Sequence, residues 1–278
     1  MKLLAIIKIT RPINFVITFL SVIIAAMISS SIFDIGVNVL LLAFSLGFTL
    51  IAGNVINDII DFEIDKVNRP ERALPKELLS IDFAKGIYVF SIITALLTAL
   101  LISIYFFFII AAFNILIGFY STHLKAIILI SNLTVAIATA TPFILGGLVV
   151  NNVEGGIIPA GFAFFTNFIR EIIKDIEDIK GDSSKGVITF PQKAGVNKAV
   201  YFAFFLILLL MLLATFPFVF GIYNAEYFVI IMVFVNPVFA YTLKLLYTNR
   251  ALPTLKKVSS LIKLNMILGL IAILIGAQ

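Results

Sequence analysis

The sequence predicts an all-α integral membrane protein, a bundle of about nine transmembrane helices around a central cavity. Of its 278 residues, 62% are hydrophobic and only 13% are charged. Apolar stretches close to the ~20 residues that a bilayer crossing requires recur along the whole chain. Most basic residues lie between these stretches or at their ends. A soluble domain of this length does not need so much apolar surface, so composition assigns the chain to the membrane.

Composition also excludes several kinds of function. The chain has no cysteine, which excludes disulfides, zinc–thiolate sites, iron–sulfur clusters and a cysteine nucleophile. Its single histidine, His123, excludes a histidine-rich metal site. The net charge of +5 does not indicate nucleic acid, because the basic residues flank apolar stretches instead of forming one basic face. We therefore expect membrane lipids as partners and no nucleic acid, and no protein partner is implied.

The apolar runs give the expected spans. They cover roughly residues 14–31, 37–58, 83–105, 106–121, 126–150, 157–174, 199–221, 226–247 and 258–277. The boundary between the third and fourth runs is poorly marked, with only Tyr105 near a possible turn, so eight spans are the alternative. The opening residues MKLLAIIKITRP are expected to be an amphipathic lead-in to the first helix. They do not resemble a cleaved signal, because no small-residue cleavage site follows a short apolar run.

The basic residues predict the orientation of these spans. With nine spans every basic cluster falls on one side of the membrane, whereas eight spans would scatter them. The loops on the other side contain Asp34, Glu154 and Glu226 and no lysine or arginine. By the positive-inside rule, the basic side is cytoplasmic. We therefore expect a multi-pass protein of the cell membrane with its N-terminus inside and its C-terminus outside.

Two sets of acidic and amide residues with the same spacing, here called the acidic stripes, are the candidate functional residues. Each reads i, i+4, i+7, i+11, which places its members on one face of an α-helix. Both stripes lie at the predicted cytoplasmic ends of spans, the second and the sixth, which suggests a parallel internal repeat within a single domain, residues 1–278. The stripes are Asn54, Asp58, Asp61 and Asp65, joined by Asn57, and Glu171, Asp175, Asp178 and Asp182.

Clustered carboxylates repel one another unless a cation lies among them. Hard oxygen ligands suit Mg²⁺, which is often bound through a few carboxylates together with substrate phosphates. One stripe alone would more often be a solvated helix end, but two stripes of identical spacing on the same side favour function. The pattern therefore predicts an enzyme that handles a lipid diphosphate. The expected metal ligands are Asn57, Asp58, Asp61, Asp65, Asp175, Asp178 and Asp182.

Basic residues beside the stripes would clamp a diphosphate. Arg69 and Arg72 follow the first stripe in NRPERALP, and Lys185 follows the second in SSKGVITFP. Arg170 and Lys174 interleave with the second stripe. Taken singly, each cation is also explained as a topology marker.

The first motif, NDIIDFEID followed by NRPERALP, resembles the signature of the UbiA superfamily of intramembrane prenyltransferases. Asn57, Asp58, Asp61 and Asp65 match its first acidic run, and Asp178 with Asp182 matches the second. Less specific similarities are Arg11-Pro12 before the first span and YSTHLK, residues 120–125, after the fourth. The resemblance in topology covers the whole chain.

This resemblance implies a mechanism. Two Mg²⁺ ions would bridge the carboxylates and the diphosphate of an isoprenyl donor, pyrophosphate would leave an allylic carbocation, and a lipid acceptor would attack it. The implied catalytic residues are Asp61, Asp65, Asp178 and Asp182. The implied substrate-binding residues are Arg11, Asn54, Lys66, Arg69, Arg72, Tyr120, Lys125, Arg170, Glu171, Lys174 and Lys185.

The acceptor is indicated by the branch of the family that the motifs resemble. The run Val67-Asn68-Arg69-Pro70 differs from the haem-farnesylating branch, and residues 175–178 differ from the ubiquinone branch. REIIKDIEDIKGD, followed by Lys-Gly and Thr-x-Pro, is similar to the branch of archaeal ether-lipid biosynthesis. That branch transfers a geranylgeranyl group from geranylgeranyl diphosphate to geranylgeranylglyceryl phosphate.

Two alternatives remain open. One is an aromatic prenyltransferase of quinone or chlorophyll biosynthesis, since part of the second motif is shared with that branch. The other is a transporter that carries divalent cations or protons on intramembrane carboxylates. Midplane acids in broken helices would favour a transporter, whereas the acids here lie at predicted helix ends.

Overall fold

Nine helices in the part of the chain that the structure describes are long and apolar enough to cross a membrane. The structure, a computed structural model, describes residues 2–30, 35–179 and 188–277. The nine candidate spans are Pro12–Ser30 (α2), Val37–Ile60 (α3), Ile81–Ile102 (α5), Ile104–Thr122 (α6), Ile130–Val149 (α7), Glu154–Glu177 (α8), Val196–Val219, Ala225–Thr248 and Leu252–Gly276 (α15). The all-α prediction and the preference for nine spans over eight are confirmed.

Shorter elements complete the described chain. The seventh span consists of α11 (Val196–Leu213) and α12 (Phe216–Val219), and the eighth begins with α13 (Ala225–Ile230) and ends with α14 (Asn236–Thr248). Outside the spans lie α1 (Lys2–Thr10), α4 (Phe62–Asn68), the 3₁₀ turn Leu124–Ala126 and α10 (Phe190–Ala194).

The third and fourth spans meet at Ser103, slightly earlier than the turn expected near Tyr105. Ser103 adopts an extended backbone with φ −172°, and its hydroxyl accepts a hydrogen bond from the Phe106 backbone N–H at 3.3 Å. Serine is a favoured N-cap because its side chain satisfies a backbone donor that the helix leaves unpaired. The apolar run shows no break here, because one capping residue is enough to end α5 and begin α6.

The helices form two compact units. The first unit comprises residues 1–127 and 142–153, and the second comprises residues 128–141 and 154–278. The prediction of an internal repeat in a single domain is not tested by this division and stays a prediction.

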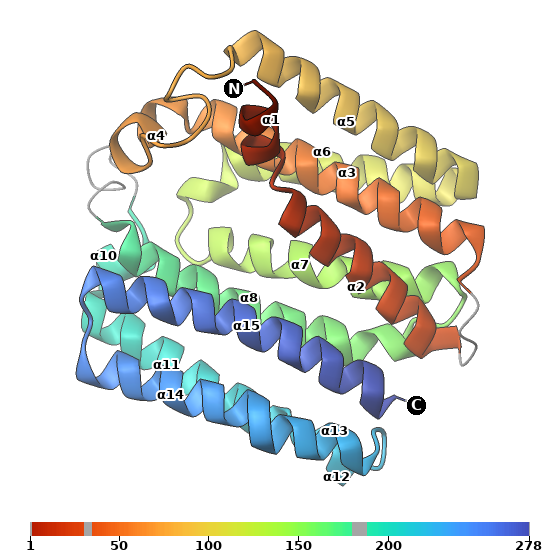
Figure 1. Ribbon diagram of the computed structural model, residues 1–278, viewed down its shortest axis with the longest axis vertical. Helices are drawn as coiled ribbons and strands as arrows, with labels where there is room; N and C mark the ends of the chain where they lie inside the picture. The colour runs from red at the N-terminus through yellow and green to blue at the C-terminus, as the bar shows by residue number, and fades with distance from the viewer. Residues whose placement is uncertain (1, 31–34, 180–187, 278) are drawn as a thin grey trace. The chain divides into compact units, whose positions relative to one another are not determined.

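In the first unit α3 is the central helix, and it packs against α1, α2, α5 and α6 (Figure 1). Small residues allow these close approaches: Gly47 faces the ring of Phe15, and the Ser45 hydroxyl donates to the Ala95 carbonyl at 2.7 Å. Small and hydroxyl-bearing residues are typical of helix contacts in membranes, where they let backbones come close together. This packing holds the end of α3, which carries the first motif.

A separate apolar cluster supports the segment after the first motif. Ala5 and Ile9 of α1 pack in this cluster with Val55 of α3 and with Leu74 and Leu79, which follow α4. All five residues are buried. Because the loop is fixed by its own apolar side chains, Arg72, two residues before Leu74, is held in place as well.

The predicted lead-in is a helix of its own. Arg11 has φ +51°, which interrupts the helix between α1 and α2, and Pro12 then begins α2. A positive φ is uncommon for a residue with a side chain, and proline is well suited to the first turn of a helix. Arg11 is therefore placed at a fixed corner of the chain.

In the second unit α8 packs against α11 and α15, and α14 packs against α15 (Figure 1). The eighth span contains a π-helical turn, Ile231–Val235, just before Pro237. Proline provides no backbone donor and crowds the preceding turn, which accounts for the irregularity. The Asn265 side chain donates to the Val235 carbonyl at 3.0 Å, so the displaced acceptor is satisfied inside the bundle.

Candidate active site

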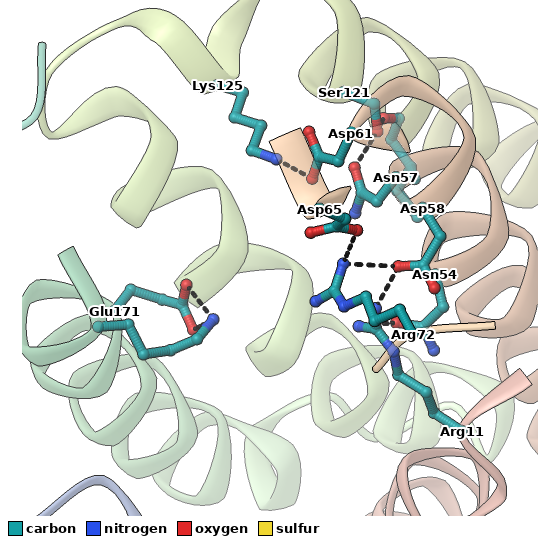
Figure 2. A network of polar contacts seen from close by, with 12 residues as sticks. Arg11, Asn54, Asn57, Asp58, Asp61, Asp65, Arg72, Ser121, Lys125 and Glu171 are labelled. Atoms are coloured by element: carbon teal, nitrogen blue, oxygen red, sulfur yellow. Dashed lines mark hydrogen bonds and ion pairs between the residues drawn. The ribbon is translucent and has the colours of Figure 1, made fainter. Parts of the chain in front are cut away.

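The first acidic motif lies where α3 ends and α4 begins. The sequence predicted one continuous helical face, but α3 ends at Ile60, and Asp61 adopts φ −80° and ψ 2°. The Asp61 N–H still donates to the Asn57 carbonyl at 2.8 Å, and the Asp65 N–H donates to the Asp61 carbonyl at 2.7 Å. The i, i+4 register therefore survives the interruption, and the polar side chains gather as Figure 2 shows.

The three carboxylates of this motif are buried. Asp58, Asp61 and Asp65 are only 5%, 8% and 4% exposed. A buried carboxylate is unfavourable unless it is paired or hydrogen-bonded. One nitrogen of Arg72, Nη1, lies 3.0 Å from Asp58 Oδ1 and 2.5 Å from Asp65 Oδ2, and the Lys125 ammonium contacts Asp61 Oδ2. The sequence prediction that Arg72 and Lys125 lie at the site is consistent with these contacts.

Arg11 reaches the same motif from the corner between α1 and α2. Its Nη2 donates to Asp58 Oδ1 at 2.5 Å, and its Nη1 donates to Asn54 Oδ1 at 3.1 Å. Burial lowers the pKa of Arg11, which Asp58 opposes, and the nearby charges of Arg72 and Arg69 lower it further. Arg72 and Arg69 therefore lie close enough to Arg11 to repel it, and an anion at this point would relieve that repulsion.

Burial also raises the pKa of the Asp65 carboxyl. The ion pair with Arg72 acts in the opposite direction, while Asp61 and Asp58 add to the increase. The buried acids thus repel one another, and their cationic partners offset part of that repulsion.

Ser121 is a residue of this site that the sequence analysis did not single out. Its hydroxyl lies 2.6 Å from Asn57 Oδ1 and 2.9 Å from the Ile117 carbonyl, so it holds the Asn57 side chain at the end of α6 (Figure 2). A possible signal was its position in YSTHLK, one helical turn before Lys125. Tyr120, the predicted substrate-binding residue beside it, also belongs to α6.

Lys66 was predicted to bind substrate, but its ammonium donates to Glu63 Oε1 at 2.8 Å in an exposed pair and does not join the buried carboxylates. Arg69 ends α4, and its backbone N–H donates to the Asp65 carbonyl at 2.9 Å. The substrate-binding roles of Lys66, Arg69 and Tyr120 remain predictions.

The second motif lies at the end of α8 in the second unit. Glu171 accepts from Arg170 Nη1 at 2.9 Å and from Lys174 Nζ at 3.0 Å. Asp175 Oδ2 accepts from the Asn132 side chain at 2.9 Å. Asp178 follows the last helical residue, and its N–H donates to the Lys174 carbonyl at 2.9 Å.

Two predicted members of this motif, Asp182 and Lys185, lie outside the described residues. Their predicted roles in metal and substrate binding are therefore unchanged.

The donor atoms of the first motif fit Mg²⁺ in kind. All are carboxylate or amide oxygens, the ligand class that Mg²⁺ prefers. Among residues 2–30, 35–179 and 188–277, no three acidic or histidine side chains converge on one point as a ready-made metal cage. Mg²⁺ usually binds through one or two carboxylates plus substrate phosphates, and this arrangement suits that mode.

An apolar hollow of about 260 Å³ lies elsewhere, within the second unit. Phe162 and Phe165 of α8 and Phe216 and Phe220, near the end of the seventh span, contribute to its lining, which includes no acidic residue. This hollow is not the central cavity that the sequence predicted, and that cavity stays a prediction.

Comparison with known proteins places the chain in a family. A model of the UbiA prenyltransferase family matches residues 15–267. The digeranylgeranylglyceryl phosphate synthase of Methanocaldococcus jannaschii is 34% identical over 277 residues, covering 99% of this chain and 97% of that protein. The protein of the same name from Methanosphaera stadtmanae is 31% identical over 272 residues, covering 98% of each chain.

Solved structures of related proteins have the same fold as this chain. One that concerns digeranylgeranylglyceryl phosphate synthase in membranes has a TM-score of 0.77 at 33% identity, covering 99% of this chain and 98% of that one. A UbiA homologue from Archaeoglobus fulgidus bound to GPP and Mg²⁺ shares the fold, with a TM-score of 0.64 at 19% identity over 97% of this chain and 99% of that one. The helices and the buried acidic motif thus define a multi-pass membrane prenyltransferase. The chain belongs to the UbiA prenyltransferase family.

Proposed function

We propose that this enzyme transfers a geranylgeranyl group from geranylgeranyl diphosphate to geranylgeranylglyceryl phosphate in archaeal ether-lipid biosynthesis, with Mg²⁺ as its cofactor. The relatives named digeranylgeranylglyceryl phosphate synthase, which align along almost the whole chain, support the choice of reaction. The homologue bound to GPP and Mg²⁺ supports a prenyl diphosphate donor and a divalent metal.

The observation that carries this proposal is the cluster in which Arg11 and Arg72, both partly exposed, contact the buried carboxylates of Asp58 and Asp65. Arginine binds phosphate groups well because its planar fork presents several donors at once. Both arginines already lie at the motif, on carboxylates that are also suited to Mg²⁺. A donor diphosphate would therefore find metal ligands and cationic donors side by side.

We assign two Mg²⁺ ions to the carboxylates and amide of the motifs. Bound there with the diphosphate, Mg²⁺ would neutralise negative charge on the leaving group. The chain's own cations would add to this: Arg72 and Arg11 would donate to diphosphate oxygens and stabilise pyrophosphate as it departs. The proposed ligands are Asn57, Asp58, Asp61, Asp65, Asp175, Asp178 and Asp182, of which Asp61, Asp65, Asp178 and Asp182 are the proposed catalytic residues.

The acceptor carries a phosphate of its own and needs further cations. We assign Arg170 and Lys174, which share Glu171, to the donor, and Lys125 or Lys185 to the acceptor phosphate. The acceptor hydroxyl is a weak nucleophile, so an allylic carbocation would form before it attacks. Asp65 is the carboxylate that we propose takes the hydroxyl proton, and a strong base is not needed because the carbocation is highly reactive.

The orientation of the enzyme follows from its basic residues. We place both acidic motifs on the cytoplasmic side, with the N-terminus inside and the C-terminus outside. The support is the absence of lysine and arginine from the loops predicted to lie on the opposite side of the membrane.

The test is transfer of radiolabelled geranylgeranyl diphosphate by purified protein, with Mg²⁺ and with excess chelator. The acceptors compared are geranylgeranylglyceryl phosphate and 4-hydroxybenzoate. We expect Mg²⁺-dependent transfer to the glyceryl phosphate. Transfer to 4-hydroxybenzoate at an equal or greater rate would favour an aromatic prenyltransferase, and full turnover in chelator would remove the metal from the proposal.

A further inference from the structure

Asn132 is a buried amide at the start of α7. Its side chain is only 2% exposed, and its Nδ2 donates to Asp175 Oδ2 at 2.9 Å, so that α7 and α8 are linked within the second unit. An asparagine in an apolar membrane helix is unfavourable unless its amide is satisfied. Its partner here is an acid of the second motif rather than a backbone carbonyl.

The orientation of this amide is fixed from both ends. The Ser131 hydroxyl donates to Asn132 Oδ1 at 3.2 Å, which leaves the nitrogen end of the amide directed at Asp175. The chain enters α7 through Leu129, whose φ of +63° is unusual for a residue with a branched side chain. A constrained entry and a satisfied carbonyl together hold Asn132 in one position against α8.

We infer that Asn132 is a positioning residue for Asp175, a role that rests on the proposed function of Asp175 as a Mg²⁺ ligand. The hydrogen bond is made to Oδ2 and restrains the orientation of the Asp175 carboxylate. An amide donor is neutral, so it orients the carboxylate without cancelling the negative charge that a metal ion requires. Partners of this kind around metal-binding carboxylates commonly change metal affinity by about 10- to 100-fold when they are removed.

The alternative is that this hydrogen bond only joins two helices. Asn114 provides a matched control, because it is also a buried asparagine in a membrane helix. It donates to Thr49 Oγ1 at 3.1 Å and to the Ile110 carbonyl at 2.9 Å, and it contacts no acid of either motif in the described chain. Leucine branches at the same carbon as asparagine and is larger, so Asn132→Leu and Asn114→Leu each remove an amide without opening a cavity. Both variants add the same volume to a buried site, so overpacking alone should affect them alike.

The experiment measures the Mg²⁺ requirement in two ways on full-length protein in detergent. The first is the Mg²⁺ concentration for half-maximal transfer, together with KM for donor and acceptor. The second involves no turnover and follows the rise in Tm as Mg²⁺ is added in the presence of inorganic pyrophosphate. We expect Asn132→Leu to need about 10- to 100-fold more Mg²⁺ in both measurements, with acceptor KM unchanged. Asn114→Leu is expected to titrate as the wild type does.

Ser131→Ala supplies a second, milder variant, because it removes only the donor to Asn132 Oδ1 and keeps the contact with Asp175. It is expected to shift both titrations in the same direction as Asn132→Leu, by a smaller factor. The inference would be overturned if Asn132→Leu and Ser131→Ala both required the same Mg²⁺ concentration as the wild type. It would also be overturned if Asn114→Leu raised the Mg²⁺ requirement as much as Asn132→Leu does. If the wild-type protein itself shows no response to Mg²⁺ with pyrophosphate, the proposed metal site is wrong and the role of Asn132 is overturned with it.

Discussion

The guanidinium of Arg72 lies on the carboxylate of Asp65, with Nη1 2.5 Å from Oδ2. The same nitrogen lies 3.0 Å from Asp58 Oδ1, so one cation joins the end of α3 to α4. The segment that follows is held by Ala73 and Leu74, which are each 2% exposed. Apolar packing of the loop therefore fixes the position of an arginine in the acidic motif.

Arg72→Lys tests whether the shape of this cation matters as well as its charge. A lysine ammonium is a compact charge on a stem that reaches less far, and we expect it to hold at most one of the two carboxylates. A hydrogen bond to a charged group contributes about 1.5–3 kcal/mol, so kcat/KM for the donor should fall by roughly 10- to 100-fold. Steady-state kinetics measures this effect. A variant with wild-type kcat/KM would mean that Arg72 does not contact the diphosphate.

The acidic motif could be predicted from sequence because helical periodicity is a local property. The positions of Asp58, Asp61 and Asp65 follow from their spacing, and the i, i+4 hydrogen bonds persist even though the helix stops at Asp61. Where the helix would stop could not be predicted, since no proline or glycine marks the end of α3.

Roles that depend on tertiary packing were harder to predict. In the sequence, Lys66 and Arg72 are both basic residues near the motif. In the structure Lys66 pairs with Glu63 at the surface, whereas the loop after α4 places Arg72 against the carboxylates. Ser121 and Asn132 were missed as site residues because a single hydroxyl or amide in an apolar stretch has no periodic pattern. Only their partners, Asn57 and Asp175, identify them.

Asp61→Ala is expected to abolish prenyl transfer while the protein still folds in detergent. Asp61 is a proposed metal ligand, and its carboxylate also holds Lys125. Glu63→Ala is the matched control, because Glu63 lies two residues away but forms only an exposed pair with Lys66, and surface pairs contribute little. The measurement is product formation at saturating donor, with size-exclusion profiles to confirm folding. Comparable activity in the two variants would remove Asp61 from the catalytic residues.

Gly146→Ala is expected to destabilise the first unit. A Cβ at Gly146 in α7 would lie 2.6 Å from the Val22 carbonyl oxygen and 2.8 Å from the Ala25 Cβ of α2, so the two helices would have to move apart. Overpacking of this kind typically costs about 1–3 kcal/mol.

Gly161→Ala in α8 is the control, because its added Cβ would meet no atom within 4 Å apart from its own residue, its chain neighbours and the nearby backbone of its own helix. Glycine in a helix interior is less favourable than alanine, so this change should leave Tm unchanged or raise it slightly. Thermal unfolding in detergent, followed by the loss of monodisperse protein, separates the two variants. Equal Tm values would show that α2 and α7 can adjust at no cost.

Reporter fusions near the two ends of the chain are expected to report opposite sides of the membrane. The described residues contain nine candidate spans, an odd number, and Lys2, Lys8 and Arg11 precede the first of them. Basic residues near the first span favour its cytoplasmic side, so a green fluorescent protein fused before α1 should fluoresce. Alkaline phosphatase fused after α15 should be active because it is exported.

Two internal fusions complete the test. A reporter after Lys76, between α4 and α5, should agree with the N-terminal fusion. Arg11, at the end of α1, contacts Asp58 of the first acidic motif, so the motif and the N-terminal end of the chain lie on the same side of the membrane. A reporter after Gly221, between α12 and α13, should agree with the C-terminal fusion. If both ends reported the same side, the number of crossings would be even. The Lys76 fusion would then show whether the orientation differs from the prediction before or after α4.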